Sequence, residues 1–409
     1  MSIKRVFLIV LFTGMLNTAY AWQATSRDFP QPEDTRSRPV LQQTRRAWQI
    51  DGVFASNRFP GARLNDFRKL NDSTYRAVIL PENKPVNKSP WYAFKLWSAK
   101  KRSIRLILDY DYGDHRYFPK ISQNGKDWAP LDSARFSMYS KQDALLLLDL
   151  GPDTLWLAAQ PVVASGDVAD WCVRQCQHPD VRQEIFGKSR LGRPLRMLEV
   201  GAGPAAQKQV VTLLCRQHPP EVTGWFALQH FMDELLSDTE LARAFRQQYR
   251  VLVFPLINPD GVDLGFWRHN AGGVDLNRDW AYYRQPETRQ VADKIVREVQ
   301  KHQSTLVLGL DFHSTFEDIF YTGDETDNPP ILPGFKDAWL AGMKTALPGF
   351  EFEEDAAAEG KPVSKSWFLA QFDATGITYE IGDNTSPDMI QQKGQVSARV
   401  MMELLLRRP

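Results

Sequence analysis

The chain reads QVVTLLCRQHPPE from residue 209 to residue 221. The apolar run Val210 to Leu214 has the length and composition of a strand that is buried on both faces. His218 and Glu221 follow this run, and the two prolines between them favour a tight turn. Because α/β folds place their sites beyond the carboxyl ends of strands, the stretch predicts an α/β sheet with a functional site at this strand end.

Similar runs recur further along the chain and alternate with amphipathic segments. The helix expected near the end opens with Ser386-Pro387, a capping residue followed by a first-turn proline. This alternation predicts an α/β sheet that is covered by helices on both faces. The strands are expected at 209–214, 251–257, 305–310 and 377–381, and the helices at 287–302, 334–347 and 386–407.

The first half of the chain has a different texture. Residues 105–112 alternate between apolar and polar side chains, and turn signals such as Asn124-Gly125 separate the short strands. We therefore expect an antiparallel β-sandwich domain at 51–165, after an irregular, proline-dotted lead-in at 22–50. The catalytic domain is expected at 180–409, with the border between Val163 and Asp180. Strands in the sandwich are expected at 74–80, 91–97 and 103–112.

The first residues have the features of a secretory signal peptide. Lys4 and Arg5 precede an apolar stretch, and Ala19-Tyr20-Ala21 resembles a cleavage site. The apolar stretch is shorter than the ~20 residues that a membrane helix needs, and no later segment approaches that length. We expect residues 1–21 to be removed and the soluble protein to be exported, either to the periplasm or out of the cell.

The composition is that of an ordinary globular protein. The 409 residues are 43% hydrophobic and 24% charged, with a formal net charge of +1. The chain therefore lacks the excess of basic residues that would indicate nucleic-acid binding. The oligomeric state is not predictable from these features. Of the three cysteines, Cys172 and Cys176 are spaced awkwardly for a disulfide within a helix, so free thiols or one strained bridge are both expected alternatives. A metal site with His178 is a less favoured reading.

Two histidines and a glutamate are candidate ligands for a metal ion. His313 ends a second apolar run, so it should face the same sheet edge as His218 and Glu221. Zn²⁺ binds imidazole nitrogen and carboxylate oxygen, and three protein ligands that leave one position open are typical of a catalytic site. H-x-x-E alone also occurs in surface turns, and a lone histidine is often a core residue, so the joint placement carries the prediction.

Two further segments carry polar groups that suit a peptide substrate. Asn277 and Arg278 offer an amide and a guanidinium, which bind a terminal carboxylate well. Asp275 is placed to accept a hydrogen bond from a ligand histidine. Glu380 stands in the apolar run 377–381, where a carboxylate is costly unless it is paired or functional. The alternative for the segment with Asn277 and Arg278 is a solvated polar turn. The alternative for Glu380 is a salt-bridge partner at the end of a sheet.

These pieces in this order resemble the zinc metallocarboxypeptidase family. The family pattern maps onto His218 and Glu221, then Arg268, then Asn277 and Arg278, then His313, then Glu380, over roughly residues 185–405. The short spacing between Arg268 and Asn277 is similar to the cytosolic carboxypeptidase-like branch. The resemblance implies a carboxypeptidase-like fold with a mixed sheet, one Zn²⁺ ion, and hydrolysis of the C-terminal residue of a peptide or protein.

The resemblance also implies a role for each residue. The three ligands would hold zinc, and Glu380 would act as general base on the attacking water. Arg268 would stabilise the oxyanion. Asn277 and Arg278 would hold the terminal carboxylate. The stretch from Asp355 to Gly360 has no tyrosine, so the flap residue of the family stays unassigned.

Lys365 falls at the base of the side-chain pocket when positions are counted back from Glu380 as in the family. A lysine there would favour an acidic C-terminal residue, but a solvated surface lysine is an equal alternative. Other readings of the chain are a cell-wall peptidase acting on γ-D-glutamyl-diaminopimelate links and a zinc deacylase of the aspartoacylase type. A binding module without catalysis is disfavoured by the intact set of ligands and Glu380.

Overall fold

The computed structural model describes residues 29–326, 329–355 and 360–407. The predicted signal peptide lies outside the described residues. The second half of the chain forms an eight-stranded mixed sheet. Its four central strands, β15, β14, β16 and β19, are parallel to one another. The order across the sheet is β12 (Val181–Lys188), β13 (Pro194–Val200), β15 (Tyr249–Phe254), β14 (Gln209–Cys215), β16 (Thr305–Thr315), β19 (Thr375–Gly382), β17 (Ile319–Tyr321) and β18 (Glu353–Asp355).

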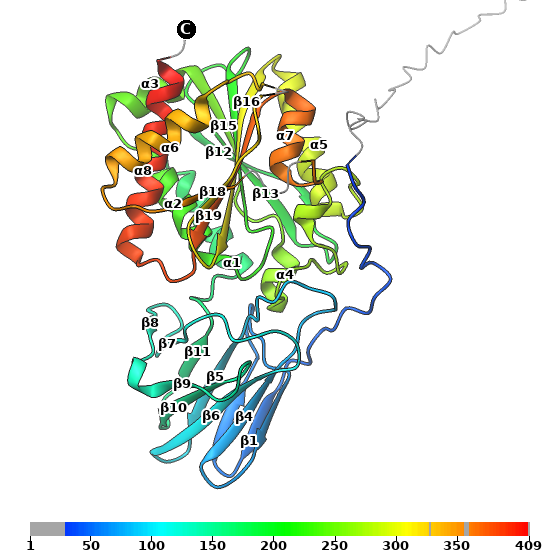
Figure 1. Ribbon diagram of the computed structural model, residues 1–409, viewed down its shortest axis with the longest axis vertical. Helices are drawn as coiled ribbons and strands as arrows, with labels where there is room; N and C mark the ends of the chain where they lie inside the picture. Colours follow the sequence, from blue (N-terminus) through cyan, green and yellow to red (C-terminus); the bar gives the residue numbers. More distant parts are fainter. Residues whose placement is uncertain (1–28, 327–328, 356–359, 408–409) are drawn as a thin grey trace, which may run out of the picture.

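Helices cover both faces of this sheet (Figure 1). In β14, Leu213 packs into one hydrophobic cluster and Leu214 into another, because successive side chains of a strand point to opposite faces. Helices α2 (Val222–Leu235), α3 (Glu240–Gln248), α6 (Phe335–Ala346) and α8 (Pro387–Leu406) contribute to the first cluster, and α5 (Pro286–Lys301) and α7 (Ser364–Phe372) to the second. The predicted mixed sheet with helices on both faces is therefore confirmed.

The element bounds differ from the prediction by amounts that tertiary pairing explains. Strand β16 continues five residues past the expected end at 310, because it pairs with β19 as far as Thr315. Helix α8 begins as expected, and the Ser386 hydroxyl accepts a hydrogen bond from Met389 N. The prediction missed α1 (Ser165–Gln175), α2, α3, α4 (Pro259–Leu264) and α7. Helix α2 is mostly buried, so it lacks the polar face by which a helix is recognised.

The first half of the chain forms two sheets that enclose one hydrophobic cluster. All strand pairs are antiparallel except β4–β6, which is parallel, so the expectation of a wholly antiparallel arrangement is wrong there. The irregular lead-in is also shorter than expected, since β1 already pairs with β2. One sheet has the order β1 (Ala47–Ile50), β2 (Val53–Ser56), β5 (Ala93–Ser98), β11 (Leu155–Ala158), β7 (Lys120–Ser122), β8 (Ala129–Pro130); the other has β3 (Asp66–Lys69), β4 (Thr74–Ile79), β6 (Arg102–Tyr110), β10 (Ala144–Leu150), β9 (Phe136–Met138).

Several contacts join the two halves. Arg116 forms an ion pair with Asp383 at 2.7 Å, and both side chains are buried. The segment before β1 runs along the catalytic half (blue in Figure 1), where Thr35 donates a hydrogen bond to the Gly273 carbonyl. The three cysteines are free, which excludes the strained bridge. In the described part of the chain, no helix is long and apolar enough to cross a membrane.

Candidate metal centre

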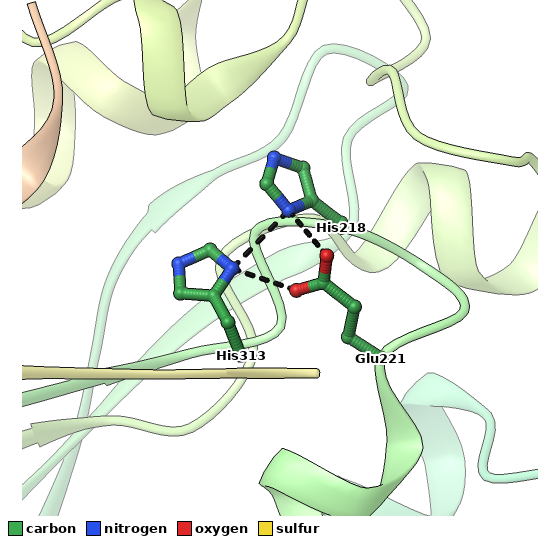
Figure 2. A group of neighbouring side chains, drawn as sticks. All are labelled: His218, Glu221 and His313. Carbon is green, nitrogen blue, oxygen red and sulfur yellow. Dashed lines mark hydrogen bonds and ion pairs between the residues drawn. The ribbon is translucent and has the colours of Figure 1, made fainter. Parts of the chain in front are cut away.

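His218, Glu221 and His313 converge at the carboxyl edge of the sheet (Figure 2). His218 follows β14, Glu221 immediately precedes α2, and His313 lies near the end of β16. The two Nδ1 atoms are 3.2 Å apart, and the Glu221 carboxylate lies 2.8 Å from the first and 2.6 Å from the second. All three side chains are buried. Their donor atoms lie within 4.8 Å of one another, an arrangement that suits a single ion.

Each histidine also contacts a carboxylate through Nε2, the ring nitrogen that does not face Glu221. His218 Nε2 lies 2.9 Å from Asp275 Oδ1, and His313 Nε2 lies 2.8 Å from Asp311 Oδ2. Such contacts fix the tautomer, so that Nδ1 keeps a lone pair for a metal. Although burial opposes it, the neighbouring Arg268 and His218 hold the pKa of Asp275 well below its usual value. The sequence predicted this position for Asp275, whereas Asp311 was missed although it stands two residues before His313.

The donor set fits a zinc ion. Two imidazoles and one carboxylate are borderline ligands that zinc binds readily, and three protein ligands leave a position for water or substrate. Burial opposes ionisation of Glu221, but the two histidines lower its pKa, so the carboxylate stays charged. A buried anion that faces two imidazole nitrogens is the electrostatic setting in which a divalent cation is stabilised.

Arg268 lies beside the three candidate ligands. Its Nε donates to Asp275 Oδ2 at 2.6 Å, and its Nη1 is 3.9 Å from Glu221 Oε1. Its backbone N–H, together with those of Trp267 and His269, donates to the buried carboxylate of Glu82 from the first half of the chain. This arrangement fixes the position of the guanidinium next to the centre.

Asn277 and Arg278 occupy a short helical turn across from β16. Asn277 Nδ2 lies 3.4 Å from His313 Nε2. The Oδ1 atom of Asn277 accepts a hydrogen bond from Ser364 N at 2.9 Å. Arg278 donates to the Asn277 carbonyl and is partly exposed. The amide is therefore oriented by the protein, while the guanidinium reaches a cavity of about 530 Å³ that is also lined by Arg268 and Asp275.

Glu380 lies directly beside His313, because the two residues are paired in the register of β16 and β19. Its Oε2 is buried and finds no hydrogen-bond partner among the described residues. Burial, followed by repulsion from Glu221, raises the pKa of Glu380, while His313 and Arg268 act in the opposite direction. An unpaired carboxylate next to a candidate metal centre is typical of a general base.

Lys365 is buried in α7, with 4% of its surface exposed, which excludes the solvated alternative. Its Nζ donates to the Thr322 carbonyl at 2.6 Å, just after β17. The stretch expected to hold a flap lies largely outside the described residues. The structure instead brings a tyrosine that sequence reasoning missed, Tyr321, to the strand next to Glu380.

Residues 170–385 match the zinc carboxypeptidase family. This match spans more than half of the chain and includes every candidate ligand. The chain belongs to the zinc carboxypeptidase family. The predicted resemblance is thereby confirmed.

Among curated proteins, the chain is similar to an uncharacterised protein of Zymomonas mobilis, with 27% identity over 60% of this chain and 61% of that protein. It is also similar to cytosolic carboxypeptidase 6 of Caenorhabditis elegans, with 22% identity over 63% of this chain and 61% of the relative. The chain thus spans about three fifths of the length of these two relatives.

Solved structures share the fold at low sequence identity. A metallo-carboxypeptidase from Burkholderia cenocepacia aligns with a TM-score of 0.74 at 18% identity, over 86% of this zinc carboxypeptidase family member and 99% of that chain. A metallo-carboxypeptidase from Pseudomonas aeruginosa, in complex with (2-guanidinoethylmercapto)succinic acid, aligns with a TM-score of 0.69 at 19% identity over 86% and 98%. Identity at this level shows a shared fold and nothing further.

Proposed function

We propose that this protein is a metallocarboxypeptidase that uses one zinc ion, held by His218, Glu221 and His313, to release the C-terminal residue of peptides. The observation that carries the proposal is the convergence of the three ligand side chains next to Glu380, whose buried Oε2 finds no hydrogen-bond partner among the described residues. Family membership supports the same reading. A catalytically silent binding module would have no use for such a costly buried carboxylate.

The chain's own residues divide the work of hydrolysis. When bound, zinc supplies Lewis-acid polarisation of the scissile carbonyl and of water. Glu380 accepts a proton from the attacking water and later donates it to the departing amine. Arg268, held by Asp275, donates hydrogen bonds to the oxyanion as negative charge develops.

Asn277 and Arg278 position the substrate by its terminal carboxylate. The Asn277 amide is already oriented by Ser364, and Arg278 offers a guanidinium at the adjoining cavity. A peptide bound in this way places its last peptide bond between Arg268 and Glu380. The same contacts would exclude substrates that lack a free C-terminus.

We further propose a preference for acidic C-terminal residues, carried by Lys365. A buried lysine is rarely retained unless it is paired or functional, and its charge would attract a side-chain carboxylate. Lys365→Ala is expected to lose activity selectively on peptides ending in Glu or Asp. Equal losses on all peptides would remove this preference from the proposal.

We also propose that a signal peptide exports the protein, and cell-wall peptides are therefore an alternative substrate to protein C-termini. Digestion of purified muropeptides distinguishes a peptidase that cleaves γ-D-glutamyl-diaminopimelate links from a carboxypeptidase that acts on protein C-termini. N-acyl amino acids test the aspartoacylase-type reading. Preferential turnover of either class over peptides with a free C-terminal residue would replace the proposed substrate.

The mechanism is tested by Glu380→Gln. The amide cannot accept a proton, so we expect turnover of peptides to fall by at least about 10³-fold, while the zinc content stays at one ion per chain. Glu353→Gln, an exposed glutamate on β18, is the matched control and should leave turnover unchanged. Undiminished turnover of Glu380→Gln would remove Glu380 from the mechanism.

A further inference from the structure

Tyr321 ends β17, the short strand that lies next to β19 and Glu380. The two strands run antiparallel, with Ile319 opposite Glu380 and Tyr321 opposite Thr378. Side chains alternate between the two faces of a sheet, so Tyr321 and Glu380 share one face and are diagonal neighbours. An aromatic side chain can reach across such a diagonal.

The packing of the intervening residues confirms which face this is. Phe320 and Tyr379, which lie opposite each other in the register, stack with ring centroids 4.4 Å apart inside the hydrophobic core. Tyr321 must therefore point away from that core, toward the side on which Glu380 and His313 lie. Its side chain is partly exposed, in contrast to its buried neighbour Phe320.

The Tyr321 hydroxyl is available to a ligand. It makes no hydrogen bond with any residue that the structure describes, and it is not one of the fully buried polar atoms. Burial raises the pKa of Tyr321, the carboxylates of Glu380, Asp355 and Glu353 raise it further, and Arg278 lowers it. The phenol thus stays neutral and can donate a hydrogen bond to a ligand.

The depth of Tyr321 decides which part of a substrate it meets. Thr378, its partner, precedes Glu380 by two residues in a strand that runs toward the site, so Tyr321 lies below Glu380 rather than at the rim. The next residue, Thr322, receives the Nζ hydrogen bond of Lys365. We expect a group below the base and beside Lys365 to meet the side chain of the C-terminal residue, because Arg278 is proposed to hold the terminal carboxylate of that residue.

We propose that Tyr321 is a specificity-determining residue whose hydroxyl donates a hydrogen bond to an oxygen on the C-terminal side chain of the substrate. This inference rests on the proposed carboxypeptidase function. It predicts selection for side chains that end in a carboxylate or a carboxamide, that is, Glu and Gln over apolar residues. Tyr321 would select for an oxygen acceptor on the substrate side chain, whereas Lys365 would select for a negative charge there.

The test compares four peptides that differ only in ending with Glu, Gln, Ala or Leu. Tyr321→Phe is expected to lower kcat/KM about tenfold for Glu and Gln, mainly through KM, and to leave Ala and Leu within about twofold. Lys365→Ala should lower the value for Glu and spare Gln. Tyr379→Phe is the matched control, because that buried ring faces the opposite side of the sheet, and it should show no such pattern.

Equal losses on all four peptides would overturn the proposal, as would unchanged values for Glu and Gln. Binding of the same peptides to Glu380→Gln and to Glu380→Gln/Tyr321→Phe, measured by calorimetry, gives the same comparison without turnover. Failure of the proposed function would appear separately, as peptides left uncleaved by the wild-type enzyme. In that case the calorimetric difference between Gln and Leu peptides still decides whether Tyr321 selects the side chain.

Discussion

Asp311 shows how a single buried residue can prepare a metal ligand. Its carboxylate lies 2.8 Å from His313 Nε2 and also accepts hydrogen bonds from Gln217 and Ser364. These donors hold the carboxylate in place, and the carboxylate in turn holds the imidazole. Despite burial, Asp311 and Glu221 raise the pKa of His313 well above its usual value, which shows how strongly negative the surroundings of this ring are.

Asp311→Asn is expected to weaken zinc binding by about 10- to 100-fold, because the amide is a poorer acceptor for the imidazole N–H. Competition with a chromophoric chelator measures the affinity directly. Asp149→Asn, on the exposed surface of the first half, is the control. Equal zinc affinity of Asp311→Asn and the wild type would show that His313 needs no carboxylate behind it.

The lowered pKa of His115, in the first half of the chain, implies that the stability of the protein depends on pH. Burial lowers its pKa to about 4, from an ordinary value of 6.5. The unfolded chain therefore takes up the proton first, and stability that is present above pH 6.5 is lost as the pH falls toward 4, by at most about 3 kcal/mol. Chemical denaturation across this range should show a smaller loss for His115→Asn than for the wild type. Parallel curves would contradict the assignment.

Helix α2 and strand β16 are the elements whose packing sets the geometry of the centre. Helix α2 follows Glu221 directly, and β16 carries His313. A Cβ built at Gly224 would lie 2.4 Å from the His313 carbonyl oxygen, so only glycine permits this approach. Thr223 and Gly224 also bond to the Ser314 hydroxyl, which fastens the helix start to the strand end. The distance between the two ligands thus depends on a contact between elements.

Gly224→Ala is expected to force α2 away from β16, with a loss of about 1–3 kcal/mol in the free energy of unfolding and weaker zinc binding. Gly166→Ala in α1 is the matched control, since a Cβ there meets nothing within 4 Å and alanine is the better helix former. Denaturant unfolding and zinc content should separate the two variants. Wild-type zinc content and stability for Gly224→Ala would show that the elements can move apart freely.

At the scale of the whole molecule, the first half of the chain contributes to the centre. The Glu82 carboxylate is fully buried and accepts hydrogen bonds from three successive backbone N–H groups, those of Trp267, Arg268 and His269, at 2.7–3.0 Å. The loop that carries Arg268 is therefore held by a residue 186 positions earlier. On the other side, Arg116 reaches Asp383, three residues after Glu380.

Glu82→Gln is expected to lower kcat/KM about tenfold or more while retaining zinc, because an amide N–H would face the backbone donors and displace the Arg268 loop. Steady-state kinetics and metal analysis on the same sample check this expectation. Glu184→Gln, at the surface of β12, serves as the control. A fully active Glu82→Gln variant would show that the loop keeps its position without the first half.

The sequence determined the local parts of this protein by itself. Apolar runs that lie before His218, before His313 and around Glu380 predicted buried strands. The common edge of parallel strands predicted that His218 and His313 meet, and the family resemblance predicted that Glu380 joins them. This works because strand burial and side-chain alternation are properties of short segments. The same logic failed for α2, which is mostly buried and so lacks a clear polar face, and for the parallel pair β4–β6 in the first half of the chain.

Only the tertiary structure decided how distant groups are combined. Several features depend on register and packing between segments that are far apart in the chain. They are the support of His313 by Asp311, the hold of Glu82 on the Arg268 loop, the burial of Lys365, and the position of Tyr321 on the same face of the sheet as Glu380. A one-residue shift of β17 would turn Tyr321 into the core, and no local pattern fixes that shift. The physical reason is that residue types specify what a segment can form, whereas the side chains across the contact specify where it is placed.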